Sequence, residues 1–367
     1  MSHAAAAPNL SRRELPEQAP LDERRLRQRI LLLILLVVVA VAVITLVPGL
    51  ESLRNRFSHA RWQWLALGSA LKLLSGLSYV AVFRSVFCNR MPWGLSARIG
   101  LAELGANAVL PTGGAGGLAL GVWALRRTGM DGERIARRSV AFFFLTSVPN
   151  VLGVIILGLG LWLGLFEGRA GIGLTLVPAL IAAAAIAITI TIGRWAGRAQ
   201  GRSAERRGET ARLPRLLGVL SGGVEESLAM LRRPTAWLLI GLVGYLAFDV
   251  MVLWATFHAF GSSPALAIVW IGYLIGELGG LIPVPGGVGG VDLGLVGTLV
   301  LYHVHVGAAT AAVLAYRALA LWIPAVVGAG AFVLLRRSLA RETVAIGNCG
   351  PGGEVEVIGR GRVRITA

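Results

Sequence analysis

Charged residues are scarce in this chain of 367 residues, where they make up 15% of the sequence. Water-soluble globular proteins typically carry about 25%. Hydrophobic residues make up 55%, so the chain has too little polar surface to fold as a globule in water. The composition excludes a soluble enzyme and predicts a protein for which the bilayer is the solvent.

Cysteine and lysine are nearly absent too. The two cysteines, Cys88 and Cys349, lie beside a membrane segment and in the C-terminal tail, which supports neither a disulfide framework nor a thiolate metal site. The single lysine is Lys72, so arginine carries almost all of the basic charge behind the formal net charge of +16. The arginines lie in short gaps between apolar runs, a pattern that indicates membrane topology and anionic headgroups and no nucleic acid partner.

An apolar run needs about 20 residues to cross the hydrocarbon core of a bilayer. Six runs approach or exceed this length, at residues 30–47, 62–83, 139–165, 172–193, 236–260 and 306–335. Two further apolar regions, 95–125 and 265–302, are broken midway by glycine and proline. Because their halves are too short for a comfortable crossing at about 1.5 Å per residue, each region predicts a re-entrant helical hairpin.

An internal repeat follows from the two glycine motifs. Residues 113–117 match residues 286–290 at an offset of 173, and a Pro-x-x-x-Gly pattern that ends at Gly153 recurs at Gly328 with an offset of 175. Each unit holds three spans and one hairpin, and three crossings is an odd number, so the second unit must be inverted. The sequence therefore predicts an all-α polytopic membrane protein with an inverted repeat, an arrangement typical of transporters whose substrate site lies near the midplane.

Arginine placement predicts the orientation of the chain. If the amino terminus is cytoplasmic and both hairpins are re-entrant, 29 arginines fall inside the cell and four outside, a bias that favours this orientation. We therefore expect a multi-pass protein of the cell inner (plasma) membrane with both termini in the cytoplasm. The expected parts are a basic N-terminal segment at 1–29, repeat 1 at 30–166 with the hairpin 95–125, repeat 2 at 172–339 with the hairpin 265–302, a basic cytoplasmic linker at 194–235 inside repeat 2, and a cytoplasmic tail at 340–367.

The glycine-rich loops are candidate phosphate-binding elements, because backbone N–H groups can approach an anion where no side chain intervenes. A soluble P-loop is disfavoured, since no strand precedes either loop and no Gly-Lys-Ser/Thr follows. In a membrane, the second half of each hairpin would begin near mid-depth with its positive dipole end. Close helix packing by small residues is the alternative. The candidate glycines are Gly113, Gly114, Gly116, Gly286, Gly287 and Gly289.

A few polar and ionisable residues lie within the apolar segments. A charge there costs about 2.5–3.5 kcal/mol on insertion scales, so each needs a partner or a role. Opposite charges in this set could form architectural pairs or, in a cavity, bind a zwitterionic or anionic headgroup and couple its movement to protons. The candidates are Lys72, Glu103, Asn107, Asp249, Glu277, Asp292 and Arg317.

Residues for catalysis or metal binding cannot be singled out. The sequence shows no Ser-His-Asp, Cys-His or paired catalytic carboxylate arrangement, so we expect no enzyme activity and no cofactor. His303 and His305 lie two residues apart, but a metal site requires a third ligand and a supporting carboxylate. We therefore expect no metal site.

Two sequence stretches carry a resemblance to a known family. Residues 107–116 read Asn-Ala-Val-Leu-Pro-Thr-Gly-Gly-Ala-Gly and are followed by Leu-Arg-Arg-Thr-Gly, while residues 283–292 read Pro-Val-Pro-Gly-Gly-Val-Gly-Gly-Val-Asp and are followed by Tyr316-Arg317. In these motifs the chain resembles the transmembrane flippase-type domain of lysylphosphatidylglycerol synthases over about 30–339. The resemblance implies polytopic helices with re-entrant elements and translocation of an aminoacylated phospholipid between leaflets.

The match to that family's pattern is uneven. Asp292 stands where the family usually has Glu, which keeps the charge, whereas Gly117 replaces an expected acidic residue, so an acid–arginine pair is missing there. Only a short tail follows Leu339. We therefore expect no aminoacyl transfer by this chain, and lysylphosphatidylglycerol need not be the substrate.

The sequence predicts a flippase-like translocase for a phospholipid or lipid-linked anionic substrate. Its expected partner is a membrane lipid, either an anionic or zwitterionic phospholipid or a lipid-linked sugar. The alternatives are a non-transporting accessory subunit of an envelope glycosyltransferase or lipid-modifying enzyme, and an integral-membrane transferase. The translocase hypothesis requires the two broken-helix elements to enter from opposite faces and to meet around a charged pocket.

Overall fold

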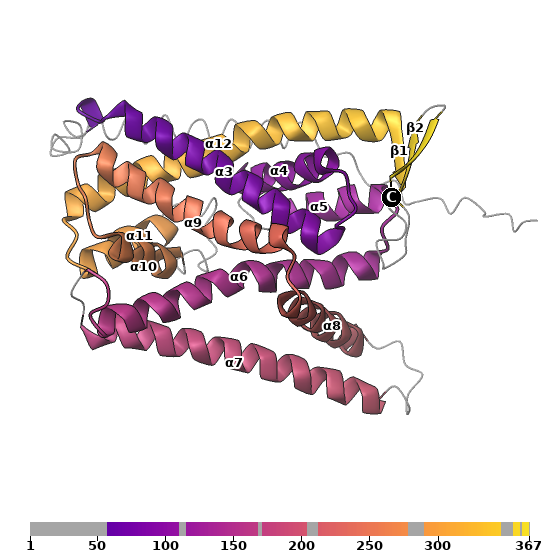
Figure 1. The fold of residues 1–367 in the computed structure, drawn as a ribbon, viewed down its shortest axis with the longest axis horizontal. Coiled ribbons are helices and arrows are strands. Elements are labelled where there is room, and N and C mark those ends of the chain that lie inside the picture. Colours follow the sequence, from indigo (N-terminus) through magenta and orange to yellow (C-terminus); the bar gives the residue numbers. More distant parts are fainter. Residues whose placement is uncertain are drawn as a thin grey trace, which may run out of the picture.

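The computed structural model describes residues 57–109, 115–167, 171–203, 212–277, 290–345, 355–359 and 362–366. These residues form ten helices followed by three strands (Figure 1). The helices are α3 (Trp62–Phe87), α4 (Trp93–Val109), α5 (Ala115–Arg127), α6 (Gly132–Trp162), α7 (Ile172–Ser203), α8 (Arg212–Arg232), α9 (Ala236–Ala259), α10 (Leu266–Gly276), α11 (Gly290–Leu301) and α12 (Val306–Arg341). The strands are β1 (Glu342–Ala345), β2 (Val355–Gly359) and β3 (Arg362–Thr366).

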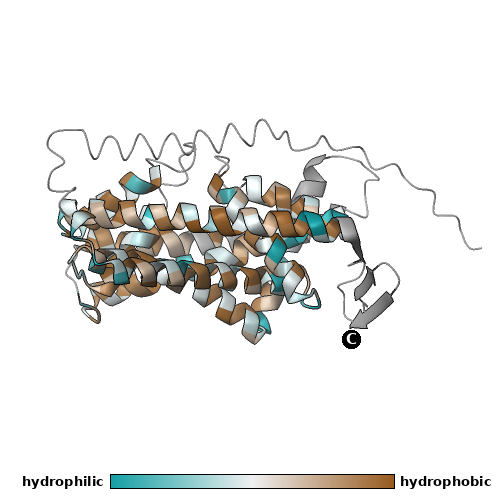
Figure 2. Cartoon of the chain, turned by 90° about the horizontal axis from the view of Figure 1, so that it is seen from above, coloured by the Kyte–Doolittle hydropathy of each residue, from teal (hydrophilic) through white to brown (hydrophobic). Residues whose placement is uncertain are grey.

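Four of the described helices, α3, α6, α9 and α12, are long and apolar enough to cross a membrane. They contain the predicted spans at 62–83 and 306–335 and most of the spans at 139–165 and 236–260, which confirms these four predictions in their essentials. Helix α7 covers the predicted span at 172–193 and contains a shorter apolar segment, Ile172–Ala184. The predicted span 30–47 lies outside the described residues. Figure 2 shows hydrophilic residues gathered toward the two ends of the bundle and an apolar surface between them.

Both regions predicted as hairpins contain two short helices that pack against each other, α4 with α5 and α10 with α11. These helices have 17, 13, 11 and 12 residues, and at about 1.5 Å per residue none of them spans a hydrocarbon core of about 30 Å. The two pairs lie toward opposite ends of the bundle, with α4 and α5 on the side of the C-terminus (Figure 1). The breaks between the helices lie outside the described residues.

Helices α3 and α9 form an extensive antiparallel contact. At one end of it, the Arg61 backbone N–H donates to the Ala259 carbonyl oxygen at 2.9 Å, and in the middle the Ser75 hydroxyl donates to the Tyr245 carbonyl oxygen at 3.2 Å. At the other end, Gly241 lies against the Ser78 backbone. Residue numbers therefore rise along α3 as they fall along α9.

The two Pro-x-x-x-Gly patterns mark crossings between the halves of the chain. Helix α12 crosses α4 with backbone against backbone: a Cβ atom on Gly328 would lie 2.5 Å from the Gly105 Cα atom. Helix α6 crosses α10 at Gly153, where a Cβ atom would lie 2.9 Å from the Leu274 Cδ1 atom. Each glycine thus faces the first helix of the hairpin in the other half.

Local sequence explains where several helices begin and end. The Asp131 carboxylate accepts from the backbone N–H groups of Glu133 and Arg134 at 2.9 and 3.2 Å and caps α6. This helix begins shortly after α5 ends at a turn where Gly129 has a φ of 83°, a conformation that favours glycine. Helix α12, which occupies the corresponding place after the second hairpin, is capped by His305, whose Nδ1 atom accepts from a backbone N–H at 3.3 Å.

The predicted linker contains a helix, and two further features of the structure were not predicted from the sequence. Helix α8 lies within the predicted basic linker 194–235, and it packs on α6 and α7 with a 2.9 Å ion pair between Glu226 and Arg138. After α12, β1, β2 and β3 form an antiparallel sheet, where the sequence analysis expected only a polar tail. Cys88, the residue after α3, is disulfide-bonded, which the spacing of the cysteines did not predict.

Candidate functional site

Charged side chains gather inside the bundle where α3, α9, α10, α11 and α12 meet. Lys72 of α3 pairs with Asp249 of α9, and the Arg317 Nε atom of α12 lies 2.8 Å from a carboxylate oxygen of α11. A fifth residue, at the C-terminal end of α10, interacts electrostatically with all four of these side chains. We call the five residues the charged cluster: Lys72, Asp249, Glu277, Asp292 and Arg317.

The pair of Lys72 and Asp249 is buried, and both carboxylate oxygens of Asp249 accept hydrogen bonds. The two side chains are 11% and 9% exposed. Asp249 receives Lys72 on one carboxylate oxygen and the hydroxyl groups of Tyr273 and Tyr316 on the other, at 2.8 and 3.2 Å. A buried charge is tolerated when it is paired and hydrogen-bonded in this way. These contacts tie α3, α9, α10 and α12 together.

The pair of Arg317 and Asp292 is more accessible, with side chains that are 24% and 23% exposed. Asp292 lies in the first turn of α11, where the helix dipole favours an anion. A guanidinium carries five N–H donors in a planar fork and suits phosphate as well as carboxylate. Arg317 is therefore the cation of the cluster that is best placed to exchange a carboxylate partner for another anion.

The first hairpin presents a different set of contacts. Glu103 is 6% exposed and hydrogen-bonds the Tyr79 hydroxyl, and α5 makes room for it, since a Cβ atom on Gly121 would lie 3.0 Å from a Glu103 carboxylate oxygen. The Asn107 Oδ1 atom accepts from the Gly117 backbone N–H at 2.8 Å and so joins the end of α4 to the start of α5. A Cβ atom on Gly117 would lie 2.5 Å from the Asn107 Cγ atom, so the glycine leaves room for the Asn107 side chain.

Tyr245 of α9 connects the two regions, because it interacts electrostatically with Asp249, Glu277 and Glu103. Tyr245 thus lies near acidic residues from both hairpin regions, Glu103 in the first and Glu277 in the second. Among the predicted glycines, Gly116 lies in the first turn of α5. The others, namely Gly113, Gly114, Gly286, Gly287 and Gly289, lie outside the described residues.

The tyrosines of this region were not predicted from the sequence. The chain has five tyrosines, and four of them contact or interact electrostatically with its acidic residues: Tyr79, Tyr245, Tyr273 and Tyr316. Their scarcity elsewhere was a usable signal. A buried tyrosine hydroxyl usually finds a hydrogen-bond partner, so tyrosines inside apolar runs point toward polar groups.

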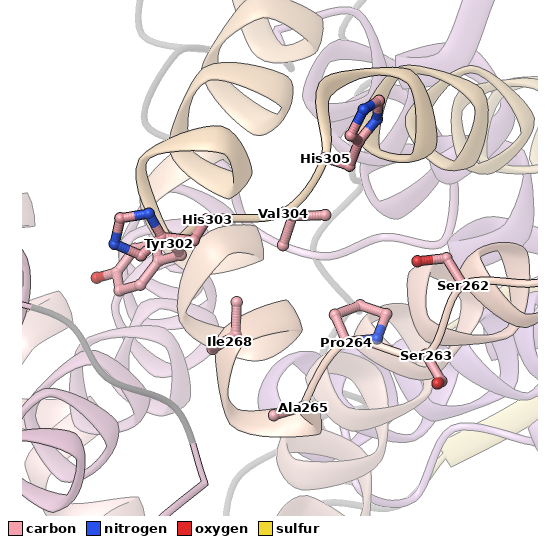
Figure 3. Close-up of a pocket in the computed structure, with 9 residues that line it drawn as sticks. All are labelled: Ser262, Ser263, Pro264, Ala265, Ile268, Tyr302, His303, Val304 and His305. Carbon is pink, nitrogen blue, oxygen red and sulfur yellow. The ribbon is translucent and has the colours of Figure 1, made fainter.

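A shallow groove lies apart from the charged cluster, in the loops that join α9 to α10 and α11 to α12 (Figure 3). Its lining residues are Ser262, Ser263, Pro264, Ala265, Ile268, Tyr302, His303, Val304 and His305. Ser262 points toward the gap, whereas the His305 ring points away from it (Figure 3). No residue of the charged cluster lines this groove, so we place the candidate site in the bundle interior. Within the described residues, no group of three or more His, Cys, Asp or Glu side chains could hold a metal ion.

Comparison with known proteins identifies the family of the chain. No curated protein matches it. Residues 30–328 match the family described as Lysylphosphatidylglycerol synthase TM region, a range that includes every helix from α3 to α11 and most of α12. Together with four helices of spanning length and composition, this match shows a multi-pass membrane protein with a lipid-related role. The chain belongs to the lysylphosphatidylglycerol synthase transmembrane-region family.

Proposed function

We propose that this protein moves a phospholipid or a lipid-linked anionic substrate across the membrane, as a flippase-like translocase. The observation that carries the proposal is the charged cluster, which brings helices from both halves of the chain together in an otherwise apolar bundle. Charged residues at membrane depth are costly and commonly mark substrate or ion pathways. The proposal involves no chemical step and no cofactor.

The packing of the helices supports an inverted repeat. The candidate equivalents α3 and α9 contact each other in antiparallel orientation, and α4 packs on α12 as α10 packs on α6. Exchange of the two halves therefore preserves the pattern of contacts. In the proposed protein the two hairpins are re-entrant and enter from opposite faces, and the halves rock against each other to expose the site alternately.

The two ion pairs have different roles in this proposal. The pair of Lys72 and Asp249 stays closed as a structural joint, because it is the more buried pair and two tyrosine hydroxyls complete its hydrogen bonding. The pair of Arg317 and Asp292 opens, and the phosphate of the substrate takes the place of Asp292. Arg317 keeps an anionic partner throughout, so the exchange does not leave its guanidinium charge unpaired. Asp292, once released, can accept from an ammonium or hydroxyl group of the headgroup.

We place the protein in the inner membrane with both termini in the cytoplasm. The start of α6 carries Arg134, Arg137 and Arg138, and it lies at the same end of the bundle as the C-terminal part of α12, which carries Arg336 and Arg337 (Figure 1). An arginine-rich end of this kind favours the cytoplasmic side.

Reconstitution into liposomes that contain a fluorescent phosphatidylglycerol tests the proposal. The wild-type protein is expected to speed the exchange of the probe between leaflets, measured by its chemical quenching from outside. Arg317→Ala is expected to lower that rate at least about tenfold, because a charge-assisted contact to phosphate contributes about 1.5–3 kcal/mol.

The matched control is Arg137→Ala. Arg137 forms an exposed pair with Glu133, with a shortest N···O distance of 3.7 Å and side chains that are 40% and 54% exposed. Its loss should leave the exchange rate unchanged. If liposomes with the wild-type protein exchange the probe no faster than protein-free liposomes, the result would contradict the proposal and favour the accessory-subunit alternative.

A further inference from the structure

Glu103 differs from the acidic residues of the charged cluster in its neighbours. Each acid of the cluster has a cation near it, whereas the titratable neighbours of Glu103 among the described residues are tyrosine hydroxyls. It lies on α4 and is 6% exposed. In this part of the chain, the titratable groups that face it are the hydroxyls of Tyr79 from α3 and Tyr245 from α9. On the side of α5, Glu103 lies against Gly121. On the side of α12, helix α4 is contacted by Gly328 and the Pro324 backbone, which carry no titratable side chain. An ionised carboxylate in such surroundings is unfavourable.

A series of tyrosine side chains lies between Glu103 and the charged cluster. Glu103 hydrogen-bonds Tyr79, and the rings of Tyr79 and Tyr245 lie 5.5 Å apart between their centroids. Tyr245 interacts electrostatically with Asp249, which accepts from two more tyrosines.

Those two tyrosines complete the series. The hydroxyl oxygens of Tyr273 and Tyr316 lie 3.5 Å from each other and 2.8 and 3.2 Å from the Asp249 carboxylate. The series joins α4 of the first hairpin to α10 of the second. A change of charge at Glu103 would therefore act electrostatically on Tyr245, which also interacts with Asp249.

We propose that Glu103 is a proton-binding site and that these tyrosines couple its protonation to the state of the charged cluster. In the conformation described, Glu103 is a neutral carboxylic acid. When α4 separates from α3 and water reaches the carboxyl group, its O–H bond breaks, the electron pair stays on the carboxylate and the proton passes to water. The consequence rests on the proposed function: movement of the lipid is coupled to the movement of a proton.

Infrared difference spectroscopy tests proton binding without reference to transport. The wild-type protein at neutral pH is expected to show a carboxylic-acid C=O stretching band that is lost in Glu103→Gln. The band should be kept in the control variant Glu133→Gln, which changes an acid whose side chain is 54% exposed. Glu103→Gln preserves the shape of the side chain, and a monodisperse elution profile verifies its fold. If the variant does not fold, Tyr79→Phe replaces it, and the same band should then shift in frequency. A wild-type spectrum without a band that these variants remove or shift would overturn the proposal.

Transport measurements test the coupling. A pH gradient across liposomes with clamped membrane potential is expected to change the wild-type exchange rate of fluorescent phosphatidylglycerol about tenfold, within the usual range of coupling between sites. Glu103→Gln should exchange lipid at a rate that no longer responds to the gradient. A response that persists in this variant, or that follows a sodium gradient at constant pH, would overturn the coupling. If the wild-type protein moves no lipid, the proposed function and the coupling fail together, and the infrared band alone decides whether Glu103 holds a proton.

Discussion

The two hairpin regions have similar glycine motifs but different interiors. The region of α4 and α5 is held by backbone and neutral contacts, namely the approach of Gly105 to Gly328 and the hydrogen bond from Gly117 to Asn107. The region of α10 and α11 borders two ion pairs and the additional carboxylate of Glu277. The difference indicates that the first hairpin mainly positions helices, while the second carries most of the charge that a substrate would meet.

Removal of one partner of the buried ion pair should have the largest effect on stability. Lys72→Met leaves the Asp249 carboxylate buried without its cation, and we expect a loss of about 3–5 kcal/mol in the free energy of unfolding. Denaturant titration of the protein in mixed micelles measures this loss. No substitution of a neutral contact in the first hairpin region should cost as much.

The matched control for Lys72→Met is the double variant Lys72→Met/Asp249→Asn. The introduced amide would still accept hydrogen bonds from Tyr273 and Tyr316 through its oxygen but would carry no charge, so most of the lost stability should return. A double variant that is as unstable as Lys72→Met would show that packing of the lysine stem, and not the unpaired charge, is what matters.

The glycines of the two Pro-x-x-x-Gly patterns should respond differently to alanine. Gly328→Ala places a Cβ atom 2.5 Å from the backbone of α4, so we expect a loss of about 1–3 kcal/mol. Gly153→Ala places it 2.9 Å from the end of the Leu274 side chain, which can move, and the loss should be under about 1 kcal/mol. The same titration in micelles measures both.

Gly330→Ala is the control for these two variants. It lies on α12 near Gly328, but a Cβ atom there would meet nothing within 4 Å. Because alanine is the better helix former, this variant should be neutral or more stable by up to about 1 kcal/mol. Equal losses at Gly328 and Gly153 would contradict the difference between the two crossings.

Much of the membrane architecture was predictable from hydropathy. Long apolar runs revealed α3, α6, α9 and α12, and the glycine and proline breaks revealed the two pairs of short helices. The charged residues of the site were also identifiable one by one, because a charge stands out within an apolar run. A polar tail with alternating valine and charged residues, as in Val355–Gly359, carried a strand signal that hydropathy over long windows does not detect.

The pairing of the charges was not predictable. Lys72 and Asp249 are 177 positions apart, and which acid a lysine meets depends on the rotation of each helix about its axis. The same limit applies to Asn107. A polar side chain inside an apolar segment suggested a substrate contact, but its side-chain oxygen Oδ1 accepts a hydrogen bond from the Gly117 backbone N–H. The tyrosines were overlooked because their rings fit an apolar run, and only the fold shows that the hydroxyl groups of Tyr273 and Tyr316 converge on Asp249.

Loss of the hydrogen bond inside the first hairpin should have a moderate effect. Asn107→Ala leaves the Gly117 N–H without its acceptor, and we expect a loss of about 1 kcal/mol. Hydrogen exchange at the start of α5, followed by mass spectrometry, should become faster. Asn150→Ala, which removes only a 3.4 Å exposed contact to Thr146, should leave that exchange unchanged. Unchanged exchange in Asn107→Ala would show that this bond does not hold the two helices together.

The smallest effect is expected at the cap of α6, outside the apolar bundle. Hydrogen bonds from the backbone N–H groups of Arg134 and Glu133 lower the pKa of Asp131 below its usual value. Because the folded-state pKa is the lower one, the stabilisation is present above the unfolded-state pKa and is lost as the pH falls through the folded-state pKa. The difference in Tm between the wild-type protein and Asp131→Ala should therefore be largest near neutral pH and should shrink in acid.

Asp131→Asn keeps a neutral capping oxygen, so its Tm difference from Asp131→Ala should stay constant over the same acid range. A wild-type advantage that persists in strong acid would show that the carboxylate charge does not stabilise the start of α6.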